Sequence, residues 1–340
     1  MNTSLKRTLQ FLLFLSFGIF LIWLSIKDIS LLDIQQIKNS FKNAKPVWVS
    51  IGVLSIVLSH IARALRWQLL IEPLNYPTQK RNLIFSVFIG YLTNLAIPRL
   101  GEIIKCSTLS KYEKIPVEKL LGTIITERVI DIISMLFIFL FTFWLQPNYI
   151  KKIYNAITGS QNHQAQITEE SNFLLFILIA SAVLIMSCFL WMYITGRSIN
   201  DVRNLFKNFI SKLAEGILSI SKLKKRAWFI FYSILIWSLY GICGYFGFLT
   251  FQEMNIYGLK EALMILCSGS IGMILTPGGI GAYTFVTQKT MELYGANSTV
   301  ALTYGWLLWI IQTGVILLGG FISMALLPII NKTTIYENKS

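Results

Sequence analysis

The chain alternates long apolar segments with short polar ones, and this pattern predicts a polytopic helical membrane protein. A helix needs roughly 20 apolar residues to cross a hydrocarbon core about 30 Å thick. Six segments meet this length, at residues 8–26, 47–71, 118–145, 172–194, 227–251 and 299–327. Two further apolar segments, 82–97 and 259–276, are shorter, and each is followed by a polar stretch with helical spacing.

Both short segments stop at a break that contains proline and glycine. The first break runs from Pro98 to Gly101 and the second from Pro277 to Gly281. Because proline removes a backbone donor and glycine permits a sharp turn, each break predicts the tip of a helical hairpin. Irregular backbone is tolerated at membrane depth only where protein shields it or where it lines a watery cavity. We therefore predict two re-entrant hairpins whose tips face each other.

The order of segments repeats at an offset of about 180 residues, although few residues are identical. We interpret residues 47–145 as a first repeat and 227–327 as a second, within a single membrane domain that covers 1–340. Gly90 and Gly269 each lie eight residues before the proline of their break. Six full spans and two hairpins would make the repeats inverted, as in many alternating-access transporters. The alternative is eight full spans with the polar arms on the surface, and the positive-inside rule accommodates both topologies.

Composition places the chain among membrane proteins and narrows the choice of partner. The chain is 54% hydrophobic and 14% charged, with a net charge of +14. The surplus of Lys and Arg is typical of an inner (cytoplasmic) membrane protein that obeys the positive-inside rule, and it favours this class over a nucleic-acid-binding protein. Residues 199–224 are expected to form an amphipathic helix on the cytoplasmic leaflet. The four cysteines show no metal-type spacing, so neither metal nor another cofactor is expected, and the sequence leaves the oligomeric state open.

Ionisable residues occur inside predicted membrane segments. In the span from 118, Glu127 and Asp131 share one helix face, whereas Arg128 is turned about 100° away. An ion at this depth costs roughly 2.5–3.5 kcal/mol, so each is expected to find a partner or water. The first break adds Arg99, Glu102 and Lys105. These six residues predict a neutral, hydrated cluster that either lines a substrate path or clamps the hairpin to the span.

Two other sets of residues complete the predicted substrate path. Arg63 and Arg66 follow His60 at three-residue spacing, and they either hold a lipid phosphate or extend to head groups at the membrane surface. The second break either offers backbone dipoles to a head group or permits close helix packing. The predicted path residues are Arg63, Arg66, Arg99, Glu102, Lys105, Glu127, Arg128, Asp131, Pro277, Gly278, Gly279 and Gly281.

These motifs resemble the membrane portion of the lysylphosphatidylglycerol synthase family, also called flippase-like or UPF0104 integral membrane proteins. The matching elements cover nearly the whole chain in the family's order; they are 62–67, 99–105, 127–131 and 277–281. The resemblance implies a membrane region that translocates lipid. The soluble aminoacyl-transferase domain of the bifunctional members is not found here, which argues against aminoacylation. Many relatives carry a glutamate where this chain has Thr284, so no role of that acid is transferred.

We therefore expect a non-enzymatic translocase of an anionic or polyprenyl-linked membrane lipid. Moving an unshielded ionised head group through hydrocarbon costs tens of kcal/mol, and a polar groove would replace the lost water. No nucleotide-binding motif is present. One alternative is a membrane enzyme or accessory subunit that uses Glu127 and Asp131 as acid and base, although no nucleophile accompanies them. Another is an ion-coupled carrier of a small solute that depends on Asp131.

Overall fold

The computed structural model describes residues 3–27, 29–149, 211 and 223–331, and every regular element in this part of the chain is a helix. The predicted all-α membrane fold is confirmed. After α1 (Thr3–Ile26) and α2 (Leu31–Lys42), a first series of helices comprises α3 (Pro46–Ile71), α4 (Lys80–Ala96), α5 (Leu100–Glu113) and α6 (Val117–Leu145). A second series comprises α10 (Arg226–Thr250), α11 (Leu259–Leu275), α12 (Ala282–Leu293) and α13 (Ser298–Ile330). Short 3-10 turns follow α3, α10 and α11, at η1 (Glu72–Leu74), η2 (Gln252–Met254) and η3 (Pro277–Gly279).

Four described helices are long and apolar enough to cross a membrane: α3 with its 3-10 extension, α6, α10 and α13. A fifth candidate joins α1 to α2 across a bend of 100°. Helices α4 and α11 have 17 residues each and are shorter than a typical span. The predicted span 172–194 and nearly all of the predicted amphipathic helix 199–224 lie outside the described residues.

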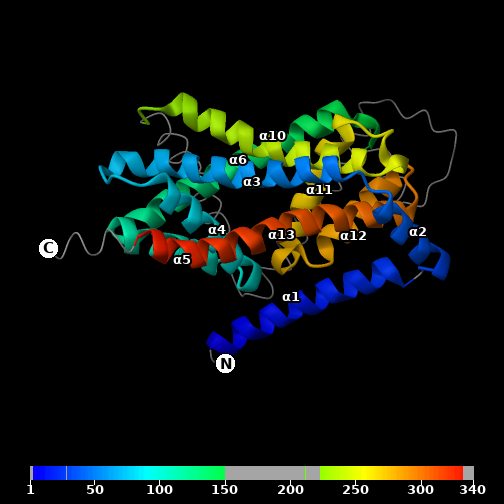
Figure 1. Ribbon diagram of the computed structural model, residues 1–340, viewed down its shortest axis with the longest axis horizontal. Coiled ribbons are helices and arrows are strands. Elements are labelled where there is room, and N and C mark those ends of the chain that lie inside the picture. Colours follow the sequence, from blue (N-terminus) through cyan, green and yellow to red (C-terminus); the bar gives the residue numbers. More distant parts are fainter. Residues whose placement is uncertain (1–2, 28, 150–210, 212–222, 332–340) are drawn as a thin grey trace.

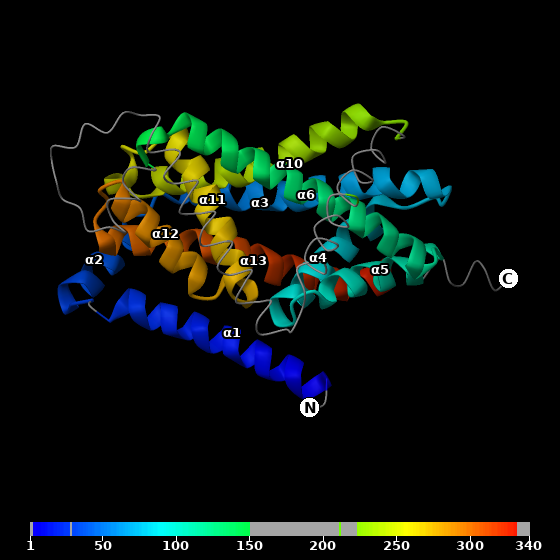
Figure 2. The same ribbon diagram turned by 180° about the vertical axis from the view of Figure 1, so that it is seen from behind.

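Corresponding helices of the two series run in opposite directions. In Figure 1, α3 and α13 run from right to left, whereas α6 and α10 run from left to right. The pair α4/α5 doubles back from the left and the pair α11/α12 from the right, and the view from behind in Figure 2 shows the same arrangement. The two tips meet near the middle of the molecule, where η3 contacts α4. A Cβ atom added to Gly278 would lie 3.1 Å from the Leu95 side chain.

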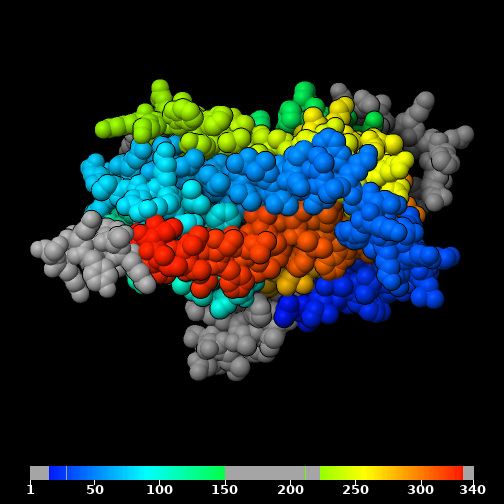
Figure 3. All heavy atoms as spheres, viewed as in Figure 1, coloured from blue at the N-terminus to red at the C-terminus, as the bar shows by residue number. Residues whose placement is uncertain are grey.

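The helices of each series pack on those of the other. Figure 3 shows α3 lying between α10 and α13 on one face of the molecule. Helix α13 also packs along α4, where Gly319 faces the ring of Phe88 and Gly320 faces Leu92. Because these glycines lack side chains, the two helices approach closely enough for the larger residues of α4 to fill the space. This packing fixes α4 against the second half of the chain.

Large apolar side chains remain exposed on the outer faces of the long helices. On α6 they include Phe137, 67% exposed, and Trp144, 75% exposed. Similar residues cover the outer faces of α10 and α13, among them Ile234, Leu318 and Phe321. Apolar faces of this extent in a helical protein are those expected to contact lipid.

The first hairpin depends on close contact between two glycines. A Cβ atom added to Gly101 at the start of α5 would overlap the carbonyl oxygen of Gly90 in α4. The Asn94 side chain accepts a hydrogen bond of 2.8 Å from the Gly101 amide and so ties the two arms at the turn. We predict that Gly101→Ala lowers the free energy of unfolding by about 1–3 kcal/mol, because the arms must separate.

The matched control for this substitution is Gly122→Ala in α6, where an added Cβ atom would meet nothing within 4 Å. This control is expected to leave stability unchanged or to raise it slightly, because alanine favours the helix. Unfolding of both variants in mixed detergent micelles, followed by the helical circular dichroism signal, measures the difference. Equal stability of the two variants would show that the hairpin tolerates separation of its arms.

The second hairpin is held by the same kind of contact. A Cβ atom added to Gly272 of α11 would lie 2.6 Å from the Cα atom of Tyr283 in α12. Helix α1 crosses this hairpin at its tip, where Gly18 lies directly against Gly281. Gly281 has φ of 72°, a value that glycine adopts without strain. The tip is therefore covered by protein on the side of α1.

Candidate functional site

The buried ions of the chain gather between α3, α5 and α6. Arg63 and Arg66 lie one turn apart on α3, and Glu127 and Asp131 lie one turn apart on α6. Lys105 reaches the same place from α5, the second arm of the first hairpin. The predicted face of Glu127 and Asp131 thus points toward α3, because ions in an apolar segment are stable only when they meet partners.

Asp131 is held by both arginines of α3. Its Oδ2 atom lies 2.7 Å from Nη1 of Arg63, and its Oδ1 atom lies 2.6 Å from Nη2 of Arg66. Each carboxylate oxygen therefore accepts one short charge-assisted hydrogen bond. The Arg66 side chain is fully buried, and it also donates to the hydroxyl of Ser233 in α10 at 3.4 Å. The hydrogen bond to Ser233 links this ion pair of the first helix series to the second series.

Only one of the two carboxylate oxygens of Glu127 is hydrogen-bonded to the described residues. Its Oε2 atom accepts a hydrogen bond of 2.8 Å from the ammonium group of Lys105. Its Oε1 atom is buried without a hydrogen-bond partner among the described residues, 3.9 Å from Arg63 and 3.8 Å from Arg66. A buried acceptor without a donor is costly, so this carboxylate is poised to accept a hydrogen bond from a third group.

Lys105 is also positioned by aromatic contact. Its ammonium group lies 4.0 Å from the ring centroid of Trp67, close enough for a cation–π interaction. The indole of Trp67 donates a hydrogen bond of 2.8 Å to the hydroxyl of Thr123 in α6, which fixes the ring. The sequence could have indicated Trp67, because it lies one turn after Arg63 on the same face of α3.

Glu102 and Arg128 form an outer ion pair that is partly exposed and lies beside Asp131 of the inner ion pair. Nε of Arg128 lies 2.8 Å from Oε1 of Glu102, and the two side chains are 41% and 31% exposed. Nη1 of Arg128 lies 4.0 Å from Oδ2 of Asp131, so the outer pair adjoins the inner one. Glu102 and Arg128 therefore form the exposed edge of the cluster.

The predicted neutral cluster of six residues is wrong in its membership and its charge. Arg99 was expected to join it, but the residue is exposed at the hairpin turn and makes no ion pair with the described residues. Its backbone adopts a left-handed conformation, with φ of 71°. Arg63 and Arg66 take its place, so four cations face three carboxylates.

The alternative that Arg63 and Arg66 extend to head groups at the membrane surface is also wrong. Arg63 is 6% exposed and Arg66 is 0% exposed. Snorkelling allows a long side chain to keep its charge in water, but here α6 offers a carboxylate at closer range. A buried arginine with a short bond to a carboxylate is the more stable arrangement in an apolar surrounding.

The second break does not contribute to the ion cluster. Pro277, Gly278 and Gly279 form the 3-10 turn η3, and the carbonyl of Gly278 accepts a hydrogen bond of 3.0 Å from the indole of Trp309. Gly278 and Gly279 have φ of 62° and 69°, in the region where glycine is unstrained. The residues of this break that were predicted as path residues thus form a turn packed on α13 and on the end of α4.

The contacts of Arg63 and His60 with the ring of Tyr91 could not be predicted from the sequence. Tyr91 of α4 lies 5.8 Å from the Arg63 guanidinium, measured to the ring centroid, and 4.8 Å from the ring of His60. Both nitrogens of His60 are buried without a hydrogen-bond partner among the described residues. The packing of α4 on α3 creates these contacts, and no spacing within one helix reveals them.

The fold and the cluster define the class of protein: a polytopic helical membrane protein with a buried ion-pair network between its spans. The model of the family described as the lysylphosphatidylglycerol synthase TM region matches residues 9–320. The chain belongs to this family, and the prediction from its motifs is confirmed. It is therefore a multi-pass membrane protein of a lipid-related family.

Two UPF0104 membrane proteins are similar in sequence to this chain. The chain is 26% identical over 296 residues to a UPF0104 membrane protein of Methanothermobacter thermautotrophicus, which covers 78% of this chain and 81% of that protein. It is 30% identical over 102 residues to a UPF0104 membrane protein of Methanocaldococcus jannaschii, which covers 29% of this chain and 30% of that protein. The longer match extends over most of both chains.

Proposed function

We propose that this protein is a non-enzymatic translocase that moves an anionic or polyprenyl-linked lipid across the cytoplasmic membrane. The observation that carries this proposal is a mostly buried ion cluster with one more cation than carboxylates, which adjoins an exposed ion pair. A surplus cation in an apolar surrounding attracts an anion. A phosphate group on a lipid would supply that anion.

The geometry supports an exchange of partners as the way in which a head group enters. Arg128 is bound to Glu102 at the exposed edge, and a phosphate would compete with that carboxylate for the guanidinium. The next donors are Arg63 and Arg66, both bound to Asp131. Arginine binds phosphate through two parallel hydrogen bonds, so each exchange keeps the guanidinium paired with an oxyanion. The first carboxylate released is Glu102, which is 31% exposed and can turn toward water.

The opposed directions of the two helix series favour alternating access. If the series are inverted repeats, rocking of one against the other would open the cluster to each side of the membrane in turn. The acyl chains of the lipid would stay in the bilayer beside the apolar outer faces of the spans. No bond of the lipid is made or broken in this scheme.

The proposal predicts selective acceleration of lipid movement by the reconstituted protein. Liposomes with the purified full-length protein are expected to translocate fluorescently labelled phosphatidylglycerol and a labelled polyprenyl phosphate faster than protein-free liposomes. Labelled phosphatidylcholine is expected to move more slowly than either, because its choline group adds a cation next to the phosphate. Accessibility of the label to dithionite from outside measures all three rates.

The bare-liposome rate for both anionic lipids would contradict the proposal. Equal acceleration of all three lipids would indicate a nonselective disturbance of the bilayer rather than recognition by the cluster. Chemical analysis of the recovered lipids tests the non-enzymatic part, because each lipid is expected to be unchanged after translocation.

A further inference from the structure

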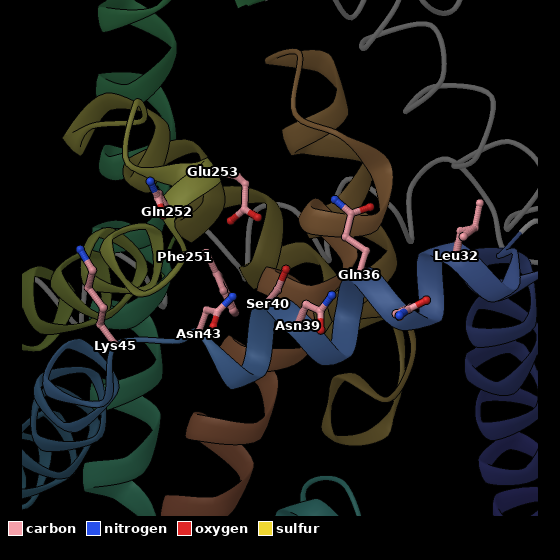
Figure 4. Close-up of a pocket in the computed structure, with 10 residues that line it drawn as sticks. Leu32, Gln36, Asn39, Ser40, Asn43, Lys45, Phe251, Gln252 and Glu253 are labelled. Atoms are coloured by element: carbon pink, nitrogen blue, oxygen red, sulfur yellow. The ribbon is translucent and has the colours of Figure 1, made fainter.

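A polar groove lies outside the ion cluster, between α2 and the turn that joins α10 to α11. Figure 4 shows α2 facing this turn, which includes the 3-10 element η2. The groove has a volume of about 400 Å³. This volume lies within the range of about 300–1,000 Å³ that is usual for small-molecule sites. No residue of the ion cluster lines it.

One wall of the groove is a row of carboxamide side chains on α2 and on the residue that caps its C-terminal end. Gln35, Gln36, Asn39 and Asn43 recur at helical spacing, so they lie along one face of the helix. Gln252 adds a fifth carboxamide from the opposite side of the groove. None of these five side chains makes a hydrogen bond to the described part of the chain, so their donors and acceptors are available to a ligand.

The floor of the groove is built from fixed elements. Phe251 is 2% exposed and packs edge to face against Phe41 of α2, with 6.0 Å between the ring centroids. The amide of Lys45 donates a hydrogen bond of 3.1 Å to the carbonyl of Thr250, which joins the start of α3 to the end of α10. These contacts hold the floor of the groove in place, which reduces the entropic cost of binding.

The chemistry of the lining selects a neutral ligand with many hydroxyl groups. Each carboxamide offers two donors and a carbonyl acceptor, and a hydroxyl group can both donate and accept. The charged residues of the lining are Lys45 and Glu253, which have opposite signs. An anion would meet no net positive charge here, in contrast to the ion cluster.

The setting of α2 indicates that the ligand belongs to a lipid. Leu31 and Ile34 are 85% and 42% exposed, so α2 presents apolar side chains outside its carboxamide row. Leu32, 78% exposed, adds an apolar side chain at the end of the groove itself. The helix follows α1 after a bend of 100°, as expected for a helix that lies in the membrane surface when α1 crosses the membrane. This orientation places the groove at the level of lipid head groups.

We propose that the groove between α2 and residues 251–253 binds the neutral sugar head group of a glycolipid. The five carboxamides hold the sugar hydroxyls, and the apolar residues of α2 contact the lipid. This site shares no residue with the ion cluster. Sugar binding in the groove and lipid translocation through the ion cluster can therefore be tested separately.

Lipid capture by the full-length protein tests this proposal. The protein is reconstituted in phosphatidylcholine nanodiscs that contain equal small amounts of glucosyl diacylglycerol and diacylglycerol, and the lipids retained after detergent extraction are counted by native mass spectrometry. The wild-type protein is expected to retain the glucosyl lipid over its sugar-free counterpart. The double variant Gln36→Leu with Asn39→Leu is expected to reduce this preference roughly tenfold, because it removes two sets of hydrogen bonds.

The control variant is Lys38→Gln, which changes an exposed residue of α2 that does not line the groove, and it is expected to retain the wild-type preference. The thermal midpoint of each variant is measured alongside to verify folding. Asp131→Asn in the ion cluster is also expected to leave glucolipid retention unchanged, which separates this site from the proposed translocation path.

Soluble methyl glucoside tests how much of the binding is due to the sugar alone and how much to the acyl chains. Partial competition by it at millimolar concentration is expected, because the hydroxyl groups are the same and only the acyl chains are missing. Equal retention of the two lipids by the wild-type protein would overturn the proposal. An unchanged preference in a folded Gln36→Leu with Asn39→Leu variant would overturn it as well.

Discussion

Replacing Arg66 with methionine is expected to lower the free energy of unfolding by about 3–5 kcal/mol. The Arg66 side chain is completely buried, 2.6 Å from Asp131 and 3.8 Å from Glu127. Its loss leaves the Oδ1 atom of Asp131 without the donor it has now, and it removes one of the two guanidinium groups near Glu127, so charged acceptors are left poorly paired in an apolar surrounding. Unfolding in mixed detergent micelles, followed by the helical circular dichroism signal, measures this change.

The exposed arginine of the same cluster serves as the control. Arg128→Met removes a cation that is 41% exposed, and the expected loss is at most about 1 kcal/mol. The double variant Arg66→Met with Asp131→Leu is expected to lose less stability than the sum of the single variants, because it removes both members of a pair. A loss equal to that sum would show that Arg66 and Asp131 do not interact energetically.

The second large effect concerns recognition, and it has opposite signs for the two members of the outer ion pair. Arg128→Gln is expected to weaken the binding of an anionic lipid about tenfold, because a charge-assisted hydrogen bond to phosphate is lost. Glu102→Gln is expected to strengthen binding, since it removes the carboxylate that occupies Arg128. Titration of dihexanoyl phosphatidylglycerol into the detergent-solubilised protein, followed by calorimetry, measures both dissociation constants.

A matched exposed ion pair elsewhere provides the control for this experiment. Lys289 and Glu292 on α12 are 2.7 Å apart and lie outside the cluster, so Lys289→Gln is expected to leave lipid affinity unchanged. If the outer pair only clamps the hairpin to α6, both Arg128→Gln and Glu102→Gln would weaken binding by loosening the site. A change of the same sign in both variants would therefore contradict the exchange of partners.

Much of the helical layout could be predicted from local properties of the sequence. Apolar segments long enough to span a membrane coincide with α3, α6, α10 and α13, because hydrophobic length and helix geometry are local quantities. The turns at Pro98 and Pro277 were predicted from the chemistry of proline and glycine. How these turns are covered was not predictable, because the contact of Gly18 with Gly281 joins segments that are far apart in the chain.

The ion cluster was predicted only in part, for a related reason. Glu127 and Asp131 share a face because both lie on one helix, and Arg128 faces another partner, Glu102, as the helical angle implies. The exclusion of Arg99 follows from its position at the turn, where its side chain is exposed instead of buried. The prediction assigned cations to acids by nearness in sequence, whereas the arginines that bind Asp131 come from α3.

The sequence by itself determined that this chain crosses a membrane, that it is interrupted at two proline and glycine turns, and that the ions in its spans must be paired. These properties follow from the free energy of placing each segment in hydrocarbon. Only the tertiary structure decided which ions pair, because Arg63 and Arg66 meet Asp131 across 68 and 65 residues of sequence. Pairing over such a separation depends on the packing of α3 against α6, since ionic attraction becomes strong only at contact distance in a buried site.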